Sequence, residues 1–363
     1  MRIKSIILPL LCLAAVSCRP QAESARSTIQ FVKDILESKG HPYRNILDAG
    51  ISMNPRGEIC LVGESESCNY LAERFETCDS RENVDGSFKS DGLPDFAGET
   101  IVRIVDNACS PYRAKIDEGN TSLLRESAVR CVLLALDTLY NVSPYDMEGI
   151  GRRNIAKTII LAEPALSVYG KYDIDTLFHA TSCVVPVVSP FELMLEGLKP
   201  GANIGIVCQD KYIGTSVYQE IASRYAADKG VPAFTCHCFS PVDSSAVLPA
   251  FLDEYVASGE SLPLDALLID DCSSSSEGVE ETLEAIRDLS KPESMKYGRL
   301  VSESFTVVES GETVLKCCFD ILRAANAFTH RVSFPRNVAF YTAPSPSKDD
   351  GSIVMIPLEN VQN

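Results

Sequence analysis

The chain has 363 residues, of which 45% are hydrophobic and 23% charged, so collagen-like, disordered and multi-span membrane classes are excluded. This length is enough for two domains, each with a hydrophobic core of its own. The formal net charge of −17 argues against nucleic acid as a partner, because binding phosphates requires a basic surface.

The N-terminus has the pattern of an export signal. Arg2 and Lys4 precede an apolar run over residues 6–16 that is too short to span a bilayer. The run ends in AVSC, which resembles the lipobox of bacterial lipoproteins, so Cys18 would carry the lipid, including palmitate. The resemblance implies a signal peptide over 1–17, a tether and first helix over 18–40, and the outer membrane as location. A plain secretory signal with a chance cysteine is the alternative.

Twelve of the 14 cysteines follow this segment, and an exported protein permits disulfides. Six of them lie inside apolar runs, where Cys behaves as a small buried hydrophobe: Cys60, Cys131, Cys208, Cys236, Cys317 and Cys318. Cys78 could pair with Cys68 or with Cys109, and the sequence leaves this open. Residues 236–238 (CHC) would alternate faces in a strand, so we expect buried thiols there and no metal site.

Clear elements are sparse in the first half of the chain. We expect a helix over 27–38, a buried strand over 57–63, a helix over 69–78 and a long buried helix over 122–140. Residues 100–108 are ambiguous between helix and strand. Residues 79–98 are predicted to be a loop, because glycine and proline recur in them.

From residue 157 onward, continuous apolar strands alternate with amphipathic helices. Strands are predicted at 158–161, 184–188, 204–208, 233–239, 264–269 and from 300, and helices at 191–198, 215–229, 245–258, 279–289 and 313–327. This alternation indicates parallel sheets covered by helices. Residues 338–341 and 353–356 read as an antiparallel pair. The prediction is an α/β fold of two lobes, with doubly wound parallel sheets, helices on both faces and a C-terminal antiparallel hairpin.

Three segments in this region, CVVPVVSP from residue 183, NIGIVCQD from 203 and LDALLIDD from 264, resemble the type 1 periplasmic binding protein fold. The resemblance spans 157–357 and implies a ligand held between the two lobes. It places an N-terminal lobe at 41–198, a C-terminal lobe at 199–335, and 336–363 as a hairpin that returns to the hinge or the first lobe. The N-terminal lobe departs from the family, because only one clear strand precedes the loop over 79–98.

A second resemblance concerns Glu163-Pro164-Ala165 and residues 204–218, which are similar to parts of aspartate/glutamate racemases. Those enzymes use two catalytic cysteines, each in a Cys-Asn-Thr or Cys-Thr-His type motif. Here Cys272 is followed by two serines, and the sequence contains no matching first motif. The sequence therefore favours the binding protein over the racemase.

Polar residues follow most of the predicted strands, and in open α/β sheets ligands bind beyond the carboxyl ends of the strands. The predicted ligand-binding residues are Glu64, Ser65, Glu163, Ser189, Asp210, Tyr212, Asp270, Asp271 and Glu303. This set is rich in carboxylates, which suit a cationic or polyhydroxy ligand, or a divalent cation held through oxygen atoms. For each residue the alternative is a solvated strand end or a helix cap. Asp210 and Asp270 are the strongest individual candidates.

Two loops carry further candidate chemistry. Asp85, Asp91, Asp95 and Glu99 could ligate a divalent metal or supply an acid/base pair, although their spacing is not that of an EF-hand. A solvated acidic loop is the alternative. The serine run over 273–276 could hold an anion at a helix start, but it contains no Lys or Arg, which favours a capping loop. His237 and His330 are expected to be structural.

The main functional prediction is an envelope-anchored protein that binds a small molecule between two lobes, and the sequence favours a binder over an enzyme. No cofactor is predicted, with a divalent cation as the exception that the carboxylates allow. The second hypothesis is a hydrolase or other enzyme that uses the acidic strand-end residues, with or without a divalent metal. The third is a scaffold lipoprotein that docks to another envelope protein. Expected partners are a small ligand and the membrane, through the lipid anchor, and not nucleic acid.

Overall fold

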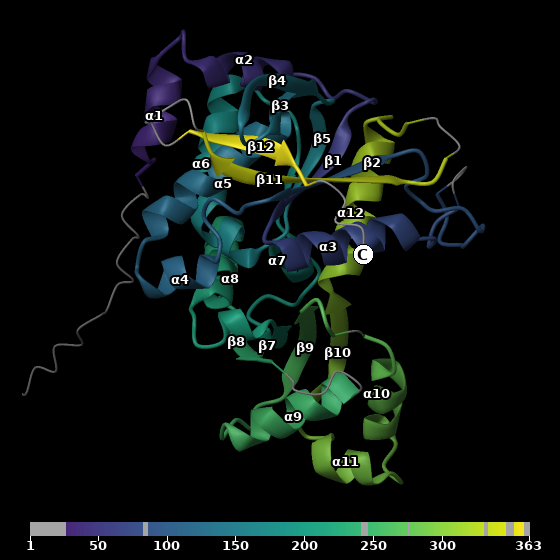
Figure 1. Cartoon of the computed structure of the whole chain (residues 1–363). Helices are drawn as coiled ribbons and strands as arrows, with labels where there is room; N and C mark the ends of the chain where they lie inside the picture. The colour runs from purple at the N-terminus through teal and green to yellow at the C-terminus, as the bar shows by residue number, and fades with distance from the viewer. Residues whose placement is uncertain are drawn as a thin grey trace, which may run out of the picture.

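Two β-sheets organise the chain into two lobes, the upper and the lower in Figure 1. The structure, a computed structural model, describes residues 27–82, 86–240, 246–274, 276–329, 333–345 and 352–358. The strand order is β12-β11-β2-β1-β5-β6 in the larger sheet and β10-β9-β7-β8 in the smaller. The predicted α/β fold with parallel, helix-flanked sheets and a C-terminal antiparallel hairpin is therefore confirmed.

The larger sheet is parallel except for its last strand. Its members are β1 (Glu58–Gly63), β2 (Thr100–Val105), β5 (Ala156–Leu161), β6 (Val187–Val188), β11 (Arg336–Pro344) and β12 (Ile353–Pro357). β1 lies between β2 and β5, β11 joins β2 in parallel, and β12 pairs antiparallel with β11. Every residue of β1 and β5 is buried, because helices cover both faces of the sheet. That is why residues 59–62 and 159–161 read as continuous apolar runs.

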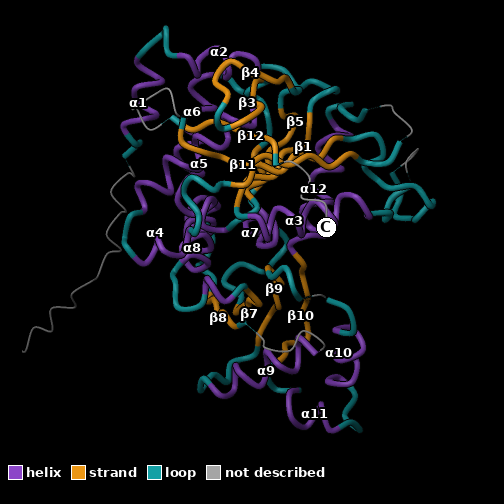
Figure 2. Tube along the Cα trace, in the orientation of Figure 1, coloured by secondary structure: helices purple, strands orange, loops and turns teal. Residues whose placement is uncertain are grey.

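Helices pack on both faces of the larger sheet (Figure 2). The helices of this lobe are α1 (Gln30–Glu37), α2 (Pro42–Ala49), α3 (Ser65–Thr77), α4 (Tyr112–Asp117), α5 (Thr121–Leu136), α6 (Pro164–Thr181), α7 (Pro190–Leu195) and α12 (Ser310–Ala324). α3, α5 and α6 make most of the contacts with the sheet. α5 and α6 belong to the main core, and α5 is buried over most of its length, so its sequence is apolar on most faces. α3 and α12 form a separate core cluster in which Phe75 and Phe319 take part.

The smaller lobe repeats the strand–helix alternation. Its strands are β7 (Asn203–Cys208), β8 (Thr235–Phe239), β9 (Leu264–Asp270) and β10 (Val301–Glu309), and its helices are α8 (Val217–Lys229), α9 (Val247–Ala257), α10 (Val279–Arg287) and α11 (Pro292–Tyr297), with a 3₁₀ turn η1 (Asp210–Tyr212). Neighbouring strands are parallel throughout. α12 follows directly on β10 and packs on α3 and α7, so the chain returns to the larger lobe, where β11 and β12 complete the sheet.

Several predicted boundaries are wrong. The ambiguous segment after residue 100 is the strand β2. The helix predicted to reach residue 140 ends at Leu136, because a hairpin of β3 (Leu139–Ser143) and β4 (Asp146–Arg152) follows it. The strand predicted from residue 300 continues to Glu309. The strands predicted at 57–63, 158–161 and 184–188 correspond to β1, β5 and β6, although β6 is shorter than predicted. β2 adds a strand that the sequence left ambiguous, because Arg103 interrupts its apolar run.

All twelve cysteines of the described residues are free thiols. Of the six expected in the core, four are buried, and Cys236 and Cys317 are half-buried. Cys78 pairs with neither of its proposed partners and donates to Asp95 Oδ2 at 3.1 Å. Cys18 and the predicted export signal lie outside the described residues, so that prediction remains untested. In the described part of the chain, no helix is long and apolar enough to cross a membrane.

The contact between α5 and α6 depends on Gly170. A Cβ at this position would lie 2.2 Å from Cβ of Ala128. We expect Gly170→Ala to destabilise the protein by about 1–3 kcal/mol through overpacking, despite the better helix propensity of alanine. Urea unfolding measures this, with Gly197→Ala as control because nothing lies within 4 Å of that site. Equal or greater stability of Gly170→Ala would show that the two helices are not this close.

Candidate functional site

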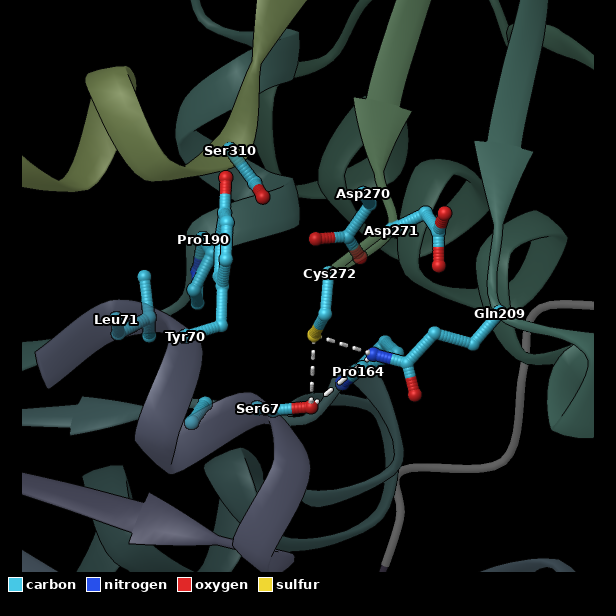
Figure 3. Close-up of a pocket in the computed structure, with 11 residues that line it drawn as sticks. Ser67, Tyr70, Leu71, Pro164, Pro190, Gln209, Asp270, Asp271, Cys272 and Ser310 are labelled. Atoms are coloured by element: carbon cyan, nitrogen blue, oxygen red, sulfur yellow. Dashed lines mark hydrogen bonds between the residues drawn. The ribbon is translucent and has the colours of Figure 1, made fainter. Parts of the chain in front are cut away.

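The carboxyl ends of strands from both sheets face a small cleft between the lobes. It is open to solvent, and its space measures about 310 Å³ when the adjoining solvent is included. Its walls come from α3, from the starts of α6, α7 and α12, and from the segments after β7 and β9 (Figure 3). The lining residues are Ser67, Tyr70, Leu71, Ala162, Pro164, Pro190, Gln209, Asp270, Asp271, Cys272 and Ser310.

A chain of hydrogen bonds leads from the cleft wall to a buried carboxylate. The Cys272 thiol donates to Ser67 Oγ across 3.8 Å, and Ser67 Oγ donates to Glu163 Oε1 at 2.6 Å. Gln209 Nε2 donates to both the sulfur and Ser67 Oγ, at 3.1 Å each (Figure 3). Cys272 and Gln209 belong to the smaller lobe and Ser67 and Glu163 to the larger, so the chain crosses the lobe boundary.

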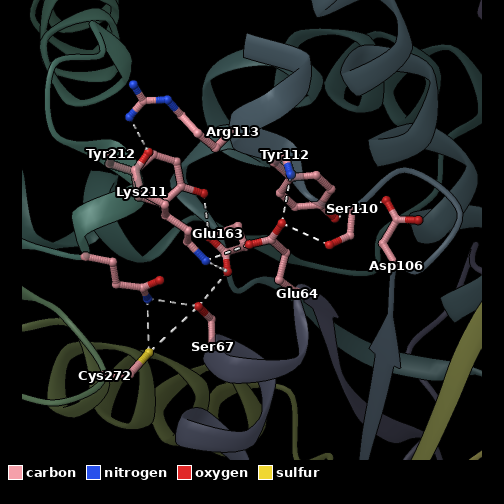
Figure 4. A network of polar contacts seen from close by, with 11 residues as sticks. Glu64, Ser67, Asp106, Ser110, Tyr112, Arg113, Glu163, Lys211, Tyr212 and Cys272 are labelled. Carbon is pink, nitrogen blue, oxygen red and sulfur yellow. Dashed lines mark hydrogen bonds and ion pairs between the residues drawn. The ribbon is translucent and has the colours of Figure 1, made fainter. Parts of the chain in front are cut away.

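Glu163 is 0% exposed and lies where β5 passes into α6. Its side chain does not cap the helix and points into the polar network of Figure 4. Besides Ser67, it accepts from Lys211 Nζ at 2.9 Å and from Tyr212 OH at 2.5 Å. Burial raises the pKa of the Glu163 carboxyl above its usual value, and the Lys211 charge and the hydroxyl donors offset this only in part.

Lys211 joins two carboxylates of the opposite lobe. Its Nζ lies 2.7 Å from Glu64 Oε2 and 2.9 Å from Glu163 Oε1. Burial acts to lower the pKa of Lys211, but the two negative charges outweigh it, so the pKa lies above its usual value. Glu64 also accepts from the N–H of Tyr112 at 2.8 Å and from Ser110 Oγ at 3.1 Å. Burial acts to raise the pKa of Glu64, but Lys211 and these donors hold it below its usual value.

Cys272 and Asp270 are among the titratable groups that line the cleft. Burial raises the pKa of the Cys272 thiol to about 12, and the charges of Glu163 and Asp270 act in the same direction. Cys272 is therefore a neutral thiol at neutral pH. Burial also raises the pKa of Asp270, although Tyr218 OH donates to its carboxylate at 2.9 Å.

The structure brings together five of the nine predicted site residues: Glu64, Glu163, Tyr212, Asp270 and Asp271. Ser189 is buried beside the cleft, directly before Pro190, and its Oγ has no hydrogen-bond partner in the described residues.

The other three point elsewhere. Ser65 is exposed on α3 and accepts from Asn69, and Asp210 is exposed at the start of η1. Glu303 lies near the beginning of β10, because that strand ends at Glu309.

Glu309 occupies the strand end that the sequence assigned to Glu303. It is nearly fully buried and forms an ion pair with Arg74, whose Nη2 lies 2.8 Å from Glu309 Oε1. The same oxygen accepts a hydrogen bond from Tyr70 OH at 3.1 Å. Ser67, Tyr70, Gln209 and Cys272 were not among the predicted site residues. Ser67 and Tyr70 lie on the first turns of a helix that follows a strand, a position that could have drawn attention to them.

Two of the four acidic loop residues, Asp95 and Glu99, are buried and bonded within the fold. Asp95 accepts from the backbone N–H groups of Ser80 and Arg81, and Glu99 pairs with the buried Lys157 at 2.5 Å. Asp91 is exposed, and Asp85 lies outside the described residues. Among the described residues, no three His, Cys, Asp or Glu side chains are grouped as a metal site would require.

The serine run and the two histidines also have local roles or lie outside the described residues. Ser273 and Ser274 donate to Asp271 at 2.6 Å each, and Ser276 Oγ donates to Glu309 at 2.8 Å. These hydroxyls are bonded to carboxylates, which disfavours an anion site. The His237 ring nitrogen Nε2 lies 2.8 Å from Asn203 Oδ1, as in a structural histidine, and His330 lies outside the described residues.

Comparison with known proteins gives no family assignment, since no family model and no curated protein matches the chain. Similar solved structures are glutamate racemases. One from Bacillus anthracis has a TM-score of 0.48 at 12% identity, covering 80% of this chain and 90% of its own. One from Francisella tularensis in complex with D-glutamate has 0.48 at 12%, covering 80% and 89%. One from Thermus thermophilus has 0.43 at 13%, covering 80% and 89%.

These neighbours correct the predicted family. The resemblance to type 1 periplasmic binding proteins is wrong, and so is the solute-binding function that followed from it, because the similar structures are racemases. They give no support to an outer-membrane lipoprotein either. The physical reason is that alternating buried strands and amphipathic helices determine layers of structure, which many unrelated functions share.

Proposed function

We propose that this chain is an enzyme that transfers protons to and from a carbon atom of a small substrate bound in the cleft. Cys272 is the group that meets the substrate, and Glu163 is its proton partner through Ser67. The observation that supports this most is the hydrogen-bonded chain from Cys272 through Ser67 to Glu163.

The proton steps balance along this chain. Ser67 passes its hydroxyl proton to Glu163 and takes the thiol proton of Cys272, leaving a thiolate and a neutral carboxylic acid. The thiolate then removes a proton from the substrate carbon, so an S–H bond forms and the C–H electron pair stays on carbon. Return of a proton from Cys272 reforms the C–H bond, and reversal of the Ser67 transfers restores the starting state.

Burial changes the pKa values at both ends of the hydrogen-bonded chain, Glu163 and Cys272, in a way that favours proton transfer between them. The raised pKa of Glu163 brings its proton affinity closer to that of Cys272, and each unit of difference removed is worth about 1.4 kcal/mol. As a neutral thiol, Cys272 is a poor nucleophile at rest but a competent acid toward a carbanion. Proton transfer therefore fits the site better than covalent catalysis.

The cleft suits a small carbon acid. Leu71, Pro164 and Pro190 form apolar walls, and Asp270, Gln209 and Ser310 place polar groups around the space. A carbon next to a carboxyl or carbonyl group is the kind of small-molecule carbon whose proton a side chain can remove. Amino acids, 2-hydroxy acids and 2-keto acids are therefore the substrate classes to examine.

Hydrogen–deuterium exchange tests the proposal across all three substrate classes at once. The protein is incubated in D2O with each class, and proton NMR follows the loss of the C2–H signal of the amino and hydroxy acids and of the C3–H signal of the keto acids, each compared with a sample without protein. We expect one class to exchange, and Cys272→Ala to slow the exchange by about 10²–10⁴-fold, the usual share of a general acid–base group. Cys317→Ala, a half-buried thiol of α12, is the control and should keep the wild-type rate.

Two results would contradict the proposal. One is a folded wild-type protein that exchanges no member of the panel. The other is a Cys272→Ala variant that exchanges at the wild-type rate.

A further inference from the structure

Arg113, on the short helix α4 of the larger lobe, reaches across to the smaller lobe (Figure 4). Its Nη1 donates to the backbone carbonyl of Lys211 at 2.9 Å and to that of Ile213 at 2.8 Å. Its Nε lies 2.8 Å from both carboxylate oxygens of Asp117, one turn further along α4. The guanidinium is thus held in place by Asp117 of its own helix and donates hydrogen bonds to the backbone on both sides of Tyr212.

The segment bonded by Arg113, residues 211–213, supplies two of the polar groups that contact Glu163. Lys211 Nζ and Tyr212 OH both contact the Glu163 carboxylate, one on each oxygen. Gln209, directly before this turn, donates to Ser67 and Cys272. Fixing the two carbonyls therefore fixes the backbone from which these side chains extend.

We infer that Arg113 is a positioning residue that holds Lys211 and Tyr212 against Glu163 and thereby keeps the Glu163 carboxyl able to accept a proton. Through this contact, the placement of the smaller lobe sets the state of a carboxylate in the larger lobe. The inference rests on the proposed function for its role in catalysis, but the contact and its electrostatic effect can be measured separately.

Burial raises the pKa of Glu163, and the charge of Lys211 is the main influence that lowers it. The groups that face Glu163 are Ser67 of α3, Glu64 directly after β1, Tyr112 of α4, Lys211 and Tyr212 of η1, and the thiols of Cys68 and Cys272. Among these groups, Lys211 carries the only positive charge. Without it, the buried carboxylate of Glu163 would face the partly buried carboxylate of Glu64, and like charges favour protonation of one of them.

Loss of the Arg113 contacts should change the pKa of Glu163 in one direction. If Lys211 withdraws, the pKa of Glu163 rises further, and more of the carboxyl is protonated at neutral pH. A protonated Glu163 cannot accept the Ser67 proton, so the acid limb of the pH–rate profile moves to higher pH.

Carbon-13 NMR of labelled glutamate side chains, with the Glu163 signal assigned through Glu163→Gln, titrates the carboxyl directly. We expect its pKa in Arg113→Ala and in Lys211→Met to be higher than in the wild type by about one unit or more, since an opposite charge at this range lowers a carboxyl pKa by about 1–3 units. Arg113→Lys should give a smaller rise, because an ammonium cannot reproduce the forked contact. Lys115→Ala is the matched control, because this α4 residue pairs with Glu118 of its own lobe.

The outcomes separate this inference from the proposed function. An unchanged Glu163 pKa in folded Arg113→Ala overturns the positioning role, whatever the exchange assay finds. If Arg113→Ala does not fold, an unchanged pKa in Arg113→Lys and Lys211→Met overturns it instead. A raised Glu163 pKa together with no exchange of any substrate supports the positioning role of Arg113 and contradicts the proposed function. Where exchange is found, its acid limb should shift with the Glu163 pKa.

Discussion

Lys157→Met is expected to lower the free energy of unfolding by about 3–5 kcal/mol, the cost of leaving a buried charge without its partner. Lys157 is 0% exposed in β5, and its Nζ lies 2.5 Å from Glu99 Oε2 and 2.7 Å from the carbonyl oxygen of Ala327. The substitution leaves Glu99 as an unpaired carboxylate in the core. It also removes the donor that ties the residues after α12 to the larger sheet.

The double variant Lys157→Met/Glu99→Gln should regain at least half of this loss, since no charge stays buried and the Gln oxygen can still accept the N–H of Thr329. Urea unfolding followed by circular dichroism gives the free energies. Lys171→Met is the control, because Lys171 pairs with an exposed Asp175 on α6 and should change stability by about 0.5 kcal/mol or less. Equal effects of Lys157→Met and Lys171→Met would contradict the prediction.

The elements of the second half of the chain could be predicted from the sequence. β7 and β9 are mainly runs of apolar residues bounded by polar or turn residues, as are the last three residues of β5, and a strand buried on both faces needs no other signal. The β3–β4 hairpin was missed because β3 is exposed or half-buried along its length and its sequence, LYNVS, does not alternate between apolar and polar residues. The end of β10 was missed because Glu303 and Ser304 are exposed within the strand.

The site was predictable in place and only partly in composition. The rule that ligands bind at the carboxyl ends of strands located Glu163 and Asp270. It could not show that Glu163 contacts Ser67 and Lys211, because those contacts join distant segments and depend on how the lobes meet. Glu99 illustrates the same limit, since its partner is a lysine inside a strand that no local pattern connects with it.

Glu163→Gln and Ser67→Ala are each expected to slow the exchange of carbon-bound hydrogen by about 10²–10⁴-fold. The two substitutions interrupt the path of the proton at different points. Glutamine can accept the Ser67 hydrogen bond but cannot take a proton. Alanine at residue 67 removes the hydroxyl that joins Cys272 to the carboxylate. In both variants the thiol loses its route to a proton acceptor.

The double variant should be no slower than the slower single variant, because residues that act as one unit give strongly non-additive losses. Rates from proton NMR in D2O, with unfolding curves to verify that each variant is folded, provide the comparison. Ser65→Ala is the matched control, since Ser65 lies on the same helix but is exposed and contacts Asn69. Losses that multiply in the double variant would mean that Ser67 and Glu163 act independently, and the hydrogen-bonded chain would then not be the path of the proton.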